Sequence, residues 1–193
     1  MRHAERNAIM SEDLIKQAAE YLRKEIPGIG SSHAHAAVAH AIGYKSKKAL
    51  LDDELLDREN PNLVLQVEWN RDVLETRISE MGGETPLKRV SAGHLMRVIH
   101  AGLAPACECC EEKRLSIKPL GYEEDDPAGW VCAPCASDEE EYGECVYCGP
   151  EYVYRADEIN SAGECPEHAG ESALDPEEEE DIESYIEYMT KDL

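Results

Sequence analysis

Phenylalanine is absent from the 193-residue chain, and its whole stock of aromatic residues is nine Tyr and two Trp. A large aromatic core is therefore excluded. No apolar run approaches the ~18 residues of a membrane-spanning helix. The first ten residues lack the apolar stretch of an export signal, so we expect a cytoplasmic protein. Basic residues are also scarce: 19 Lys and Arg against 42 Asp and Glu give a net charge of −23. This balance excludes binding to nucleic acid mainly through bulk positive charge.

The two halves of the chain differ in charge and in cysteine content. Residues 1–106 carry 14 basic and 15 acidic side chains and no cysteine, whereas residues 107–193 carry 5 basic and 27 acidic side chains and all eight cysteines. A change of composition at a proline, here at Ala104-Pro105-Ala106, is typical of a domain boundary. We expect a helical module over residues 1–104, a metal-binding region over 105–170 and an acidic helix over 171–193.

The first part has the signals of four to six α-helices. Apolar residues recur at helical spacing, and Ser, Gly and Pro stand where helices begin and end. The predicted helices run from Ser11 to Ile26, from Ser31 or Ser32 to Ile42, from Ser46 to about Leu56, from Asn70 to Met81, and from Ser91 to Gly102. The segment Leu63–Trp69 fits both a strand and a helix, and we favour a helix.

Part of this module resembles a known unit. The residues that carry the resemblance are Ala34, the run Val38-Ala39-His40-Ala41-Ile42-Gly43-Tyr44-Lys45-Ser46, and Ala49-Leu50. They resemble the small helical domain of bacterial glyoxalase-related proteins and the helix-turn-helix units of AraC-type regulators. The resemblance implies a helix-turn-helix-like unit near residues 11–57. It implies no glyoxalase activity, since that enzyme needs His and Glu ligands spread over a much larger β-rich domain.

A helix-turn-helix-like unit suggests DNA as a ligand. Lys45, Lys47 and Lys48 stand at the start of the would-be recognition helix of the unit, where side chains can reach phosphates or base edges. The acidic residues 52–54 follow on the same helix and would repel phosphate. We therefore interpret the unit mainly as a packing module and keep the three lysines as possible nucleic-acid contacts.

The histidines of the first half do not have metal-ligand spacing. His33, His35 and His40 lack the i, i+4 separation that places two imidazoles on one face of a helix. We expect them to be surface or half-buried residues. His94 and His100 are expected on the surface of the last predicted helix of this half.

Four pairs of residues in the second half have the spacing of metal ligands. The pairs are Cys107 and Cys110, Cys132 and Cys135, Cys145 and Cys148, and Cys165 and His168. Two intervening residues form a tight knuckle that directs two ligands at one ion, and two knuckles supply the four ligands that zinc prefers. We predict two structural Zn²⁺ ions. Disulfides are disfavoured because no export signal is present.

Two ways of combining the pairs remain open. In the sequential arrangement the first pair joins the second and the third joins the fourth, so that the region resembles tandem zinc ribbons. In the cross-braced arrangement, which RING-like domains use, the first pair joins the third. The gaps between the pairs favour the sequential arrangement, with Leu115–Lys118 and Gly129–Val131 as one hairpin and Tyr152–Arg155 as a further strand.

Cys109 is left without a pair. It could replace Cys107 as a ligand, but the two-residue spacing favours Cys107. The acidic neighbours Glu108, Glu111 and Glu112 oppose a reactive thiolate, so we interpret Cys109 as a spare thiol. Because four protein ligands leave no open position on either ion, we assign no catalytic residue and expect no enzyme activity.

The acidic residues gather in three runs, over 123–126, 138–141 and 177–181. The last run begins the predicted terminal helix, which has Asp175 as its cap and an apolar stripe of Ile182, Ile186 and Met189. This helix either docks on its own ribbon or recognises a basic partner. An acidic surface of this density attracts basic protein surfaces.

We therefore expect an α+β fold, in which a small helical module precedes two zinc-ribbon-like β units and an acidic helix. The predicted function is that of a non-enzymatic zinc-binding adaptor or regulator of the bacterial cytoplasm, whose partner is a protein with a basic surface. In composition the chain is similar to accessory proteins carried by plasmids and other mobile elements. One alternative is an acidic inhibitor that occupies a nucleic-acid-binding groove of a host protein. Another is a DNA-binding transcriptional regulator that uses the helix-turn-helix-like unit.

Overall fold

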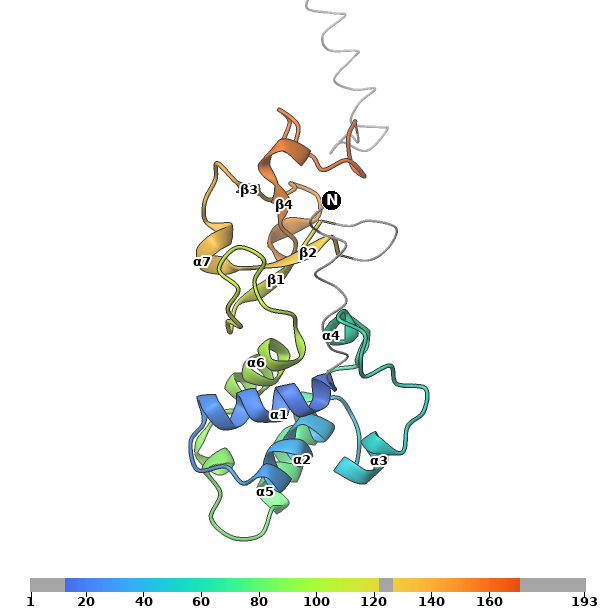
Figure 1. Cartoon of the computed structure of the whole chain (residues 1–193), viewed down its shortest axis with the longest axis vertical. Helices are drawn as coiled ribbons and strands as arrows, with labels where there is room; N and C mark the ends of the chain where they lie inside the picture. Colours follow the sequence, from blue (N-terminus) through green and yellow to red (C-terminus); the bar gives the residue numbers. More distant parts are fainter. Residues whose placement is uncertain (1–12, 122–126, 171–193) are drawn as a thin grey trace, which may run out of the picture.

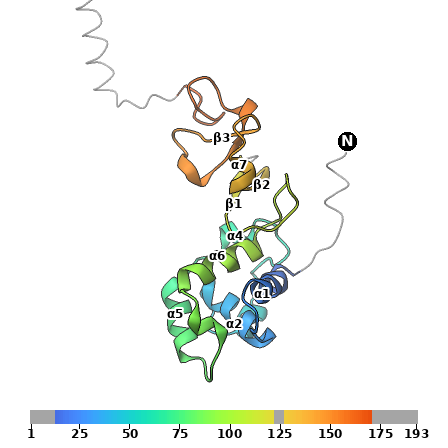
Figure 2. The same ribbon diagram turned by 90° about the vertical axis from the view of Figure 1, so that its left-hand side faces the viewer.

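The computed structural model describes residues 13–121 and 127–170 and shows a mixed α+β fold. Helices form the first half of the chain, and two small antiparallel sheets form the second half (Figure 1). In two perpendicular views the helices that precede residue 104 gather at one end of the molecule, and the strands lie at the other end together with the short helix Ala133–Ala136 (Figures 1 and 2). None of the described helices is long and apolar enough to span a bilayer. The predicted acidic helix over 171–193 lies outside the described residues.

The helices and strands are short. The helices are α1 (Leu14–Glu25), α2 (Ser31–Ala41), α3 (Lys47–Leu51), α4 (Leu63–Gln66), α5 (Arg71–Glu80), α6 (Ala92–Leu103) and α7 (Ala133–Ala136), with 3-10 turns η2 (Pro86–Arg89), η3 (Gly149–Glu151) and η4 (Ala156–Glu158). The strands are β1 (Ile117–Leu120), β2 (Gly129–Cys132), β3 (Tyr142–Gly143) and β4 (Tyr154–Arg155).

Side-chain oxygens fix the starts of several helices, because each accepts a hydrogen bond from an N–H group that has no partner within the helix. Ser46 accepts from the N–H of Ala49 at 3.1 Å, and Ser91 accepts from the N–H of His94 at 3.3 Å. The prediction of Ser46 and Ser91 as N-caps is confirmed. The predicted caps of the first two helices were wrong: Asp13, not Ser11, is the N-cap of α1, and Gly30, not Ser31 or Ser32, is the N-cap of α2.

The third helix is shorter than its sequence predicted, because Asp53 makes a competing turn. The carboxylate of Asp53 accepts hydrogen bonds from the N–H of Leu55 at 2.9 Å and from the hydroxyl of Tyr44 at 2.6 Å. Such local bonds offer the backbone an alternative to the helix. α3 therefore ends at Leu51 and not near Leu56.

A glycine inside α6 allows close contact with α1. Gly102 was expected to end this helix, but the helix continues to Leu103. A Cβ atom at Gly102 would lie 2.7 Å from the Cα of Ala18 and 3.2 Å from its Cβ. The residue is thus part of a backbone-to-backbone packing contact between two helices rather than a stop signal.

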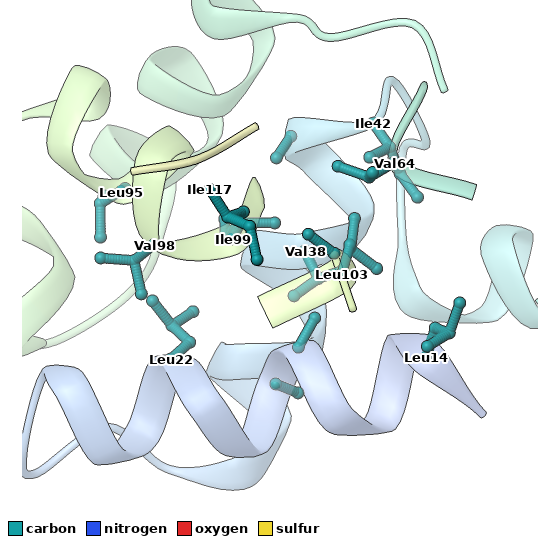
Figure 3. Packing of buried hydrophobic residues seen from close by; sticks show 14 of the residues in the cluster. Leu14, Leu22, Val38, Ile42, Val64, Leu95, Val98, Ile99, Leu103 and Ile117 are labelled. Atoms are coloured by element: carbon teal, nitrogen blue, oxygen red, sulfur yellow. The ribbon is translucent and has the colours of Figure 1, made fainter. Parts of the chain in front are cut away.

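One hydrophobic core joins the helices to the first hairpin. Its buried members include residues of α1, α2, α5 and α6 together with Ile117, Leu120, Trp130 and Val131 of β1 and β2. Figure 3 shows Ile117 among the buried side chains of the helices. α6 ends at Leu103, next to the boundary predicted near residues 104–106, but the core continues across that position.

The two hairpins differ in length and in what they pack against. In the first, Ile117 of β1 lies opposite Cys132 of β2 in antiparallel register, so the predicted hairpin is present with its first strand shifted by two residues. In the second, Tyr142 of β3 lies opposite Arg155 of β4. A single bridge between Leu120 and Val153 connects the two hairpins. The second hairpin lies farther from the helices than the first (Figures 1 and 2).

The close contact at Gly102 gives a stability prediction. We expect Gly102→Ala to lower the free energy of unfolding by about 1–3 kcal/mol, because the added methyl group would overlap the backbone of Ala18. Gly93→Ala on the same helix is the matched control, since a Cβ there meets no atom within 4 Å. Thermal unfolding followed by far-UV circular dichroism measures both. Equal stability of the two variants would contradict the close approach.

Candidate metal centres

Eight residues converge in two groups of possible metal ligands. The first group is Cys107, Cys110, Cys132 and Cys135, and the second is Cys145, Cys148, Cys165 and His168. Within each group the ligand atoms all lie within 4.8 Å of one another. The groups combine the four pairs sequentially and not in the cross-braced way. Each group could hold a metal ion, and we name them the four-cysteine centre and the cysteine–histidine centre.

The four-cysteine centre is built where the helical half meets the first hairpin. Cys107 and Cys110 lie in the turn that follows α6, Cys132 ends β2, and Cys135 lies in α7. The N–H of Cys132 donates to the sulfur of Cys107 at 3.3 Å, and the sulfurs of Cys110 and Cys132 are 3.8 Å apart. After the first knuckle, Glu111 has a φ of 61°, which non-glycine residues rarely adopt. This turn brings the first pair to face the second.

Backbone donors surround the sulfur of Cys107. Burial raises the pKa of this thiol, but hydrogen bonds from the N–H groups of Cys110, Cys132 and Cys109 outweigh burial and lower the pKa to about 7. The hydrogen bond with Cys132 and burial raise the pKa of Cys135. Four adjacent thiols thus oppose one another's ionisation, and a bound cation would remove that opposition.

The cysteine–histidine centre is arranged around one nitrogen of His168. Its Nδ1 lies 3.2 Å from the sulfur of Cys165, 3.3 Å from that of Cys148 and 3.7 Å from that of Cys145. The sulfurs of Cys148 and Cys165 are 3.9 Å apart. The ring of Tyr147 stacks on the imidazole with centroids 5.4 Å apart, which orients His168 toward the three sulfurs.

Tyr154 adjoins this centre, which the sequence analysis did not foresee. Its hydroxyl lies 3.1 Å from the sulfur of Cys148, and its side chain is 3% exposed. Burial and this hydrogen bond raise the pKa of Tyr154. The hydroxyl therefore stays protonated and donates a hydrogen bond to the sulfur. Such a donor beside a ligand holds the ligand in place. The only sequence signal for Tyr154 was the alternation of residues 152–155.

Lys113 is a second residue that the sequence analysis missed. Its ammonium group donates to the backbone carbonyls of Gly102, at 3.0 Å, and of Ala104, at the end of α6. Its own carbonyl accepts a hydrogen bond from the hydroxyl of Tyr21 in α1 at 3.4 Å. Burial lowers the pKa of Lys113 to about 8. A cation at the carboxyl end of a helix is favourable, and here it connects the first knuckle of the four-cysteine centre to α6.

The remaining thiol and the other histidines lie outside both centres. Cys109 is exposed. His33 is exposed and His35 is half-buried, as predicted, with a hydrogen bond between His35 and the carbonyl of Ser31. The prediction for His40 was wrong, because this residue is buried, with a hydrogen bond to the carbonyl of Tyr44. The surface position expected for His100 was wrong: it is half-buried against Trp69, and this burial lowers its pKa.

The three lysines considered as nucleic-acid contacts lie around the start of α3. Lys45 and Lys48 are exposed and Lys47 is half-buried. α3 has five residues, which is short for a helix that reads the major groove. A nucleic-acid contact by these lysines stays a prediction.

The chain was compared with protein-family models, curated proteins and solved structures, and none of them matches. The resemblances described for the helix-turn-helix-like unit and for the ribbons therefore stay predictions. What the centres can do has to be inferred from their own geometry.

The exposure of Cys109 gives a labelling prediction. In the native protein, iodoacetamide should modify Cys109 first, because the other seven cysteines lie in the two centres, where they are buried or half-buried. Peptide mapping by mass spectrometry identifies the labelled residue. The Cys109→Ser variant should resist labelling until the protein is unfolded or treated with a chelator. Equally fast labelling of a centre cysteine would contradict this assignment.

Proposed function

We propose that the protein is a non-enzymatic zinc-binding adaptor or regulator, in which two structural zinc ions hold an acidic surface for a basic protein partner. The observation that carries this proposal is the convergence of eight ligands into two complete sets of four. Because the described cysteines are free thiols, a reducing compartment such as the bacterial cytoplasm suits the protein.

The distances within the centres support zinc as the ion. Tetrahedral zinc, with Zn–S of about 2.3 Å and Zn–N of about 2.0 Å, separates two sulfurs by about 3.8 Å and a sulfur from a nitrogen by about 3.5 Å. The sulfur pairs here are 3.8 and 3.9 Å apart, and the sulfur–nitrogen distances are 3.2, 3.3 and 3.7 Å. A disulfide would require about 2.05 Å.

The donor set supports a structural role for the ion. Four thiolates, or three thiolates and an imidazole, fill the tetrahedral coordination of zinc and leave no position for a substrate. When bound, zinc would supply a cross-link between the two knuckles of each centre. The chain's own residues then hold that cross-link in place: Tyr154 and Tyr147 orient two ligands, and backbone N–H groups stabilise the thiolate of Cys107.

Charge supports a basic partner. Every basic side chain described between residues 107 and 170 already has an internal partner: Lys113 with two carbonyls of α6, Arg114 with Glu112, Lys118 with Glu144 at 3.2 Å, and Arg155 with Glu108 at 2.9 Å. The exposed carboxylates of Glu139, Glu140 and Glu141 therefore have no basic side chain of this region left to balance them. Such a field attracts basic surfaces and speeds association with them.

The same surface fits the second candidate, an acidic inhibitor that occupies a nucleic-acid-binding groove. The favouring observation is again that the local basic side chains are neutralised internally. The two candidates differ in one respect: nucleic acid competes with an inhibitor for its partner but not with an adaptor.

The metal content gives the first test of this proposal. We expect two zinc ions per chain, counted by native mass spectrometry with elemental analysis. Cys110→Ser and Cys148→Ser should each bind one ion fewer, because each removes a ligand from one centre. Cys109→Ser is the matched control and should keep both ions. A freshly isolated protein without stoichiometric zinc would overturn the proposal.

The role of charge gives the second test. The partner is first isolated by affinity capture on the unmodified protein. We expect a variant with four carboxylates neutralised to bind this partner about tenfold more weakly and with less dependence on salt. Its substitutions are Glu139→Gln, Glu140→Gln, Glu141→Gln and Glu151→Gln. The control removes the same charge from exposed residues of the helical half, by Glu20→Gln, Glu54→Gln, Glu68→Gln and Glu75→Gln. Binding is measured by titration calorimetry, with and without added nucleic acid. Equal weakening by both variants would show a general charge effect and contradict the proposed surface.

A further inference from the structure

We propose that the two centres have different roles: the four-cysteine centre is a permanent part of the helical fold, and the cysteine–histidine centre is exchangeable. The metal of the cysteine–histidine centre can then leave while the helices stay folded. This inference rests on the proposed zinc sites and adds a regulation to them.

Exposure of the ligands does not distinguish the centres. Each has two buried and two half-buried ligands. The difference lies in the side chains that surround the ligands, because a metal leaves only when the structure around it opens.

The four-cysteine centre is embedded in the main core. Cys107 and Cys132, each 1% exposed, belong to the same buried cluster as Leu103 of α6 and Ile99 one turn earlier. The indole N–H of Trp130, two residues before Cys132, donates to Asn62 at 3.4 Å, across to the helical half. Opening this centre would therefore expose helical side chains as well.

Polar contacts reinforce this connection. Lys113, three residues after Cys110, donates to the last carbonyls of α6, and its carbonyl accepts from Tyr21 of α1. α1 and α6 are the two helices that meet at Gly102. The turn that carries the first two ligands is thus bound to both of the helices that form the closest helical contact.

The cysteine–histidine centre has a core of its own. Its buried residues are Cys145, Tyr154 and Cys165, and Tyr147, Cys148, Tyr152 and Ile159 pack against them. All of these lie between residues 145 and 165, and none of them belongs to the main core. The adjoining Tyr142 and Val153 do belong to the main core, so the second hairpin borders both cores.

Among the described residues, backbone hydrogen bonds to the first hairpin join Val153 to Pro119 and Gly121, at 3.2 and 2.7 Å. Two partly exposed ion pairs, Lys118 with Glu144 and Arg155 with Glu108, add side-chain links to the rest of the chain.

Metal binding is coupled to folding of the segment that carries the ligands. A set of ligands on an independently folding unit therefore binds and releases its metal as that unit alone folds and unfolds. The unit over residues 145–168 also carries exposed carboxylates, those of Glu151, Asp157, Glu158 and Glu167. When the unit loses its metal and opens, these carboxylates would no longer be held in a fixed arrangement. Metal availability would thereby control part of the acidic surface.

The test is a chelator titration of the full-length protein after its two metals have been counted. Native mass spectrometry counts the bound metals, and far-UV circular dichroism measures the helical content. Tryptophan fluorescence reports on packing of the main core around the four-cysteine centre, since Trp69 and Trp130 both belong to that core. We expect EDTA to remove the first metal without a change in the helical signal or the tryptophan emission. At higher EDTA concentration, loss of the second metal should be accompanied by loss of the helical signal and a change in the tryptophan emission. Simultaneous loss of both metals and the helical signal would overturn the inference.

A matched pair of variants gives a second readout. Cys148→Ser, at the half-buried second ligand of the cysteine–histidine centre, should keep one metal and shift the helical melting temperature by less than about 2 °C. Cys110→Ser, at the equivalent ligand of the four-cysteine centre, should lower it by about 10 °C or more, or prevent folding. Equal effects of the two variants would overturn the inference.

The Lys113→Met variant tests whether Lys113 connects the four-cysteine centre to the helices, because it leaves all eight metal ligands in place. It should keep two metals, lower the helical melting temperature and release the metal of the four-cysteine centre at a lower chelator concentration than in the unmodified protein. Lys118→Met, which removes only the ion pair with Glu144, is the control and should change neither property. Unchanged behaviour of Lys113→Met would overturn the inference. A protein isolated without metal would overturn the proposed function itself, which distinguishes the two failures.

Discussion

Convergence of seven thiols and one imidazole into two sets of four, each of which could hold a metal ion, is the feature on which the second half of the molecule depends. Its strands have two or four residues, and pairing of that length is marginal without further support. Half of the ligands are themselves buried core residues: Cys107, Cys132, Cys145 and Cys165. Without a cation the four-cysteine set resists full ionisation, because the hydrogen bond with Cys132 and burial raise the pKa of Cys135. The proposed zinc ions would turn this opposition into a cross-link and replace the apolar interior that an anionic segment cannot build.

The contrast in composition between the two halves does not correspond to a division of the core. The helical half is near neutral and free of cysteine, and the second half is acidic and rich in cysteine. Nevertheless, buried residues of the first hairpin pack with the helices, and Lys113 bonds to the end of α6. The second hairpin borders both cores, because Tyr142 packs in the main core and Tyr154 packs beside the cysteine–histidine centre. Two structurally similar centres therefore stand in different surroundings.

Local signals predicted much of the fold, and long-range contacts account for what the sequence did not reveal. The caps Ser46 and Ser91 were predictable because a cap acts within three residues of itself. Pairs of ligands two residues apart were equally visible, and the lengths of the gaps favoured the sequential combination that the structure has. The role of Gly102 depends on Ala18, more than eighty positions earlier, and the role of Lys113 depends on Tyr21 and α6. His100 and Tyr154 were misjudged or missed for the same reason, since Trp69 and Cys148 approach them only in the folded chain.

The bridge between Leu120 and Val153 has a mechanical consequence. In the described part of the chain, the backbones of the two hairpins meet through this bridge, with one hydrogen bond on each side of Val153. A joint of two bonds resists twisting far less than a continuous sheet does. Two ion pairs, Lys118 with Glu144 and Arg155 with Glu108, also cross this joint, so rotation of the outer hairpin about this axis would have to break them. Because partly exposed ion pairs are weak, a partner that binds the outer hairpin could supply the free energy for such an adjustment of angle.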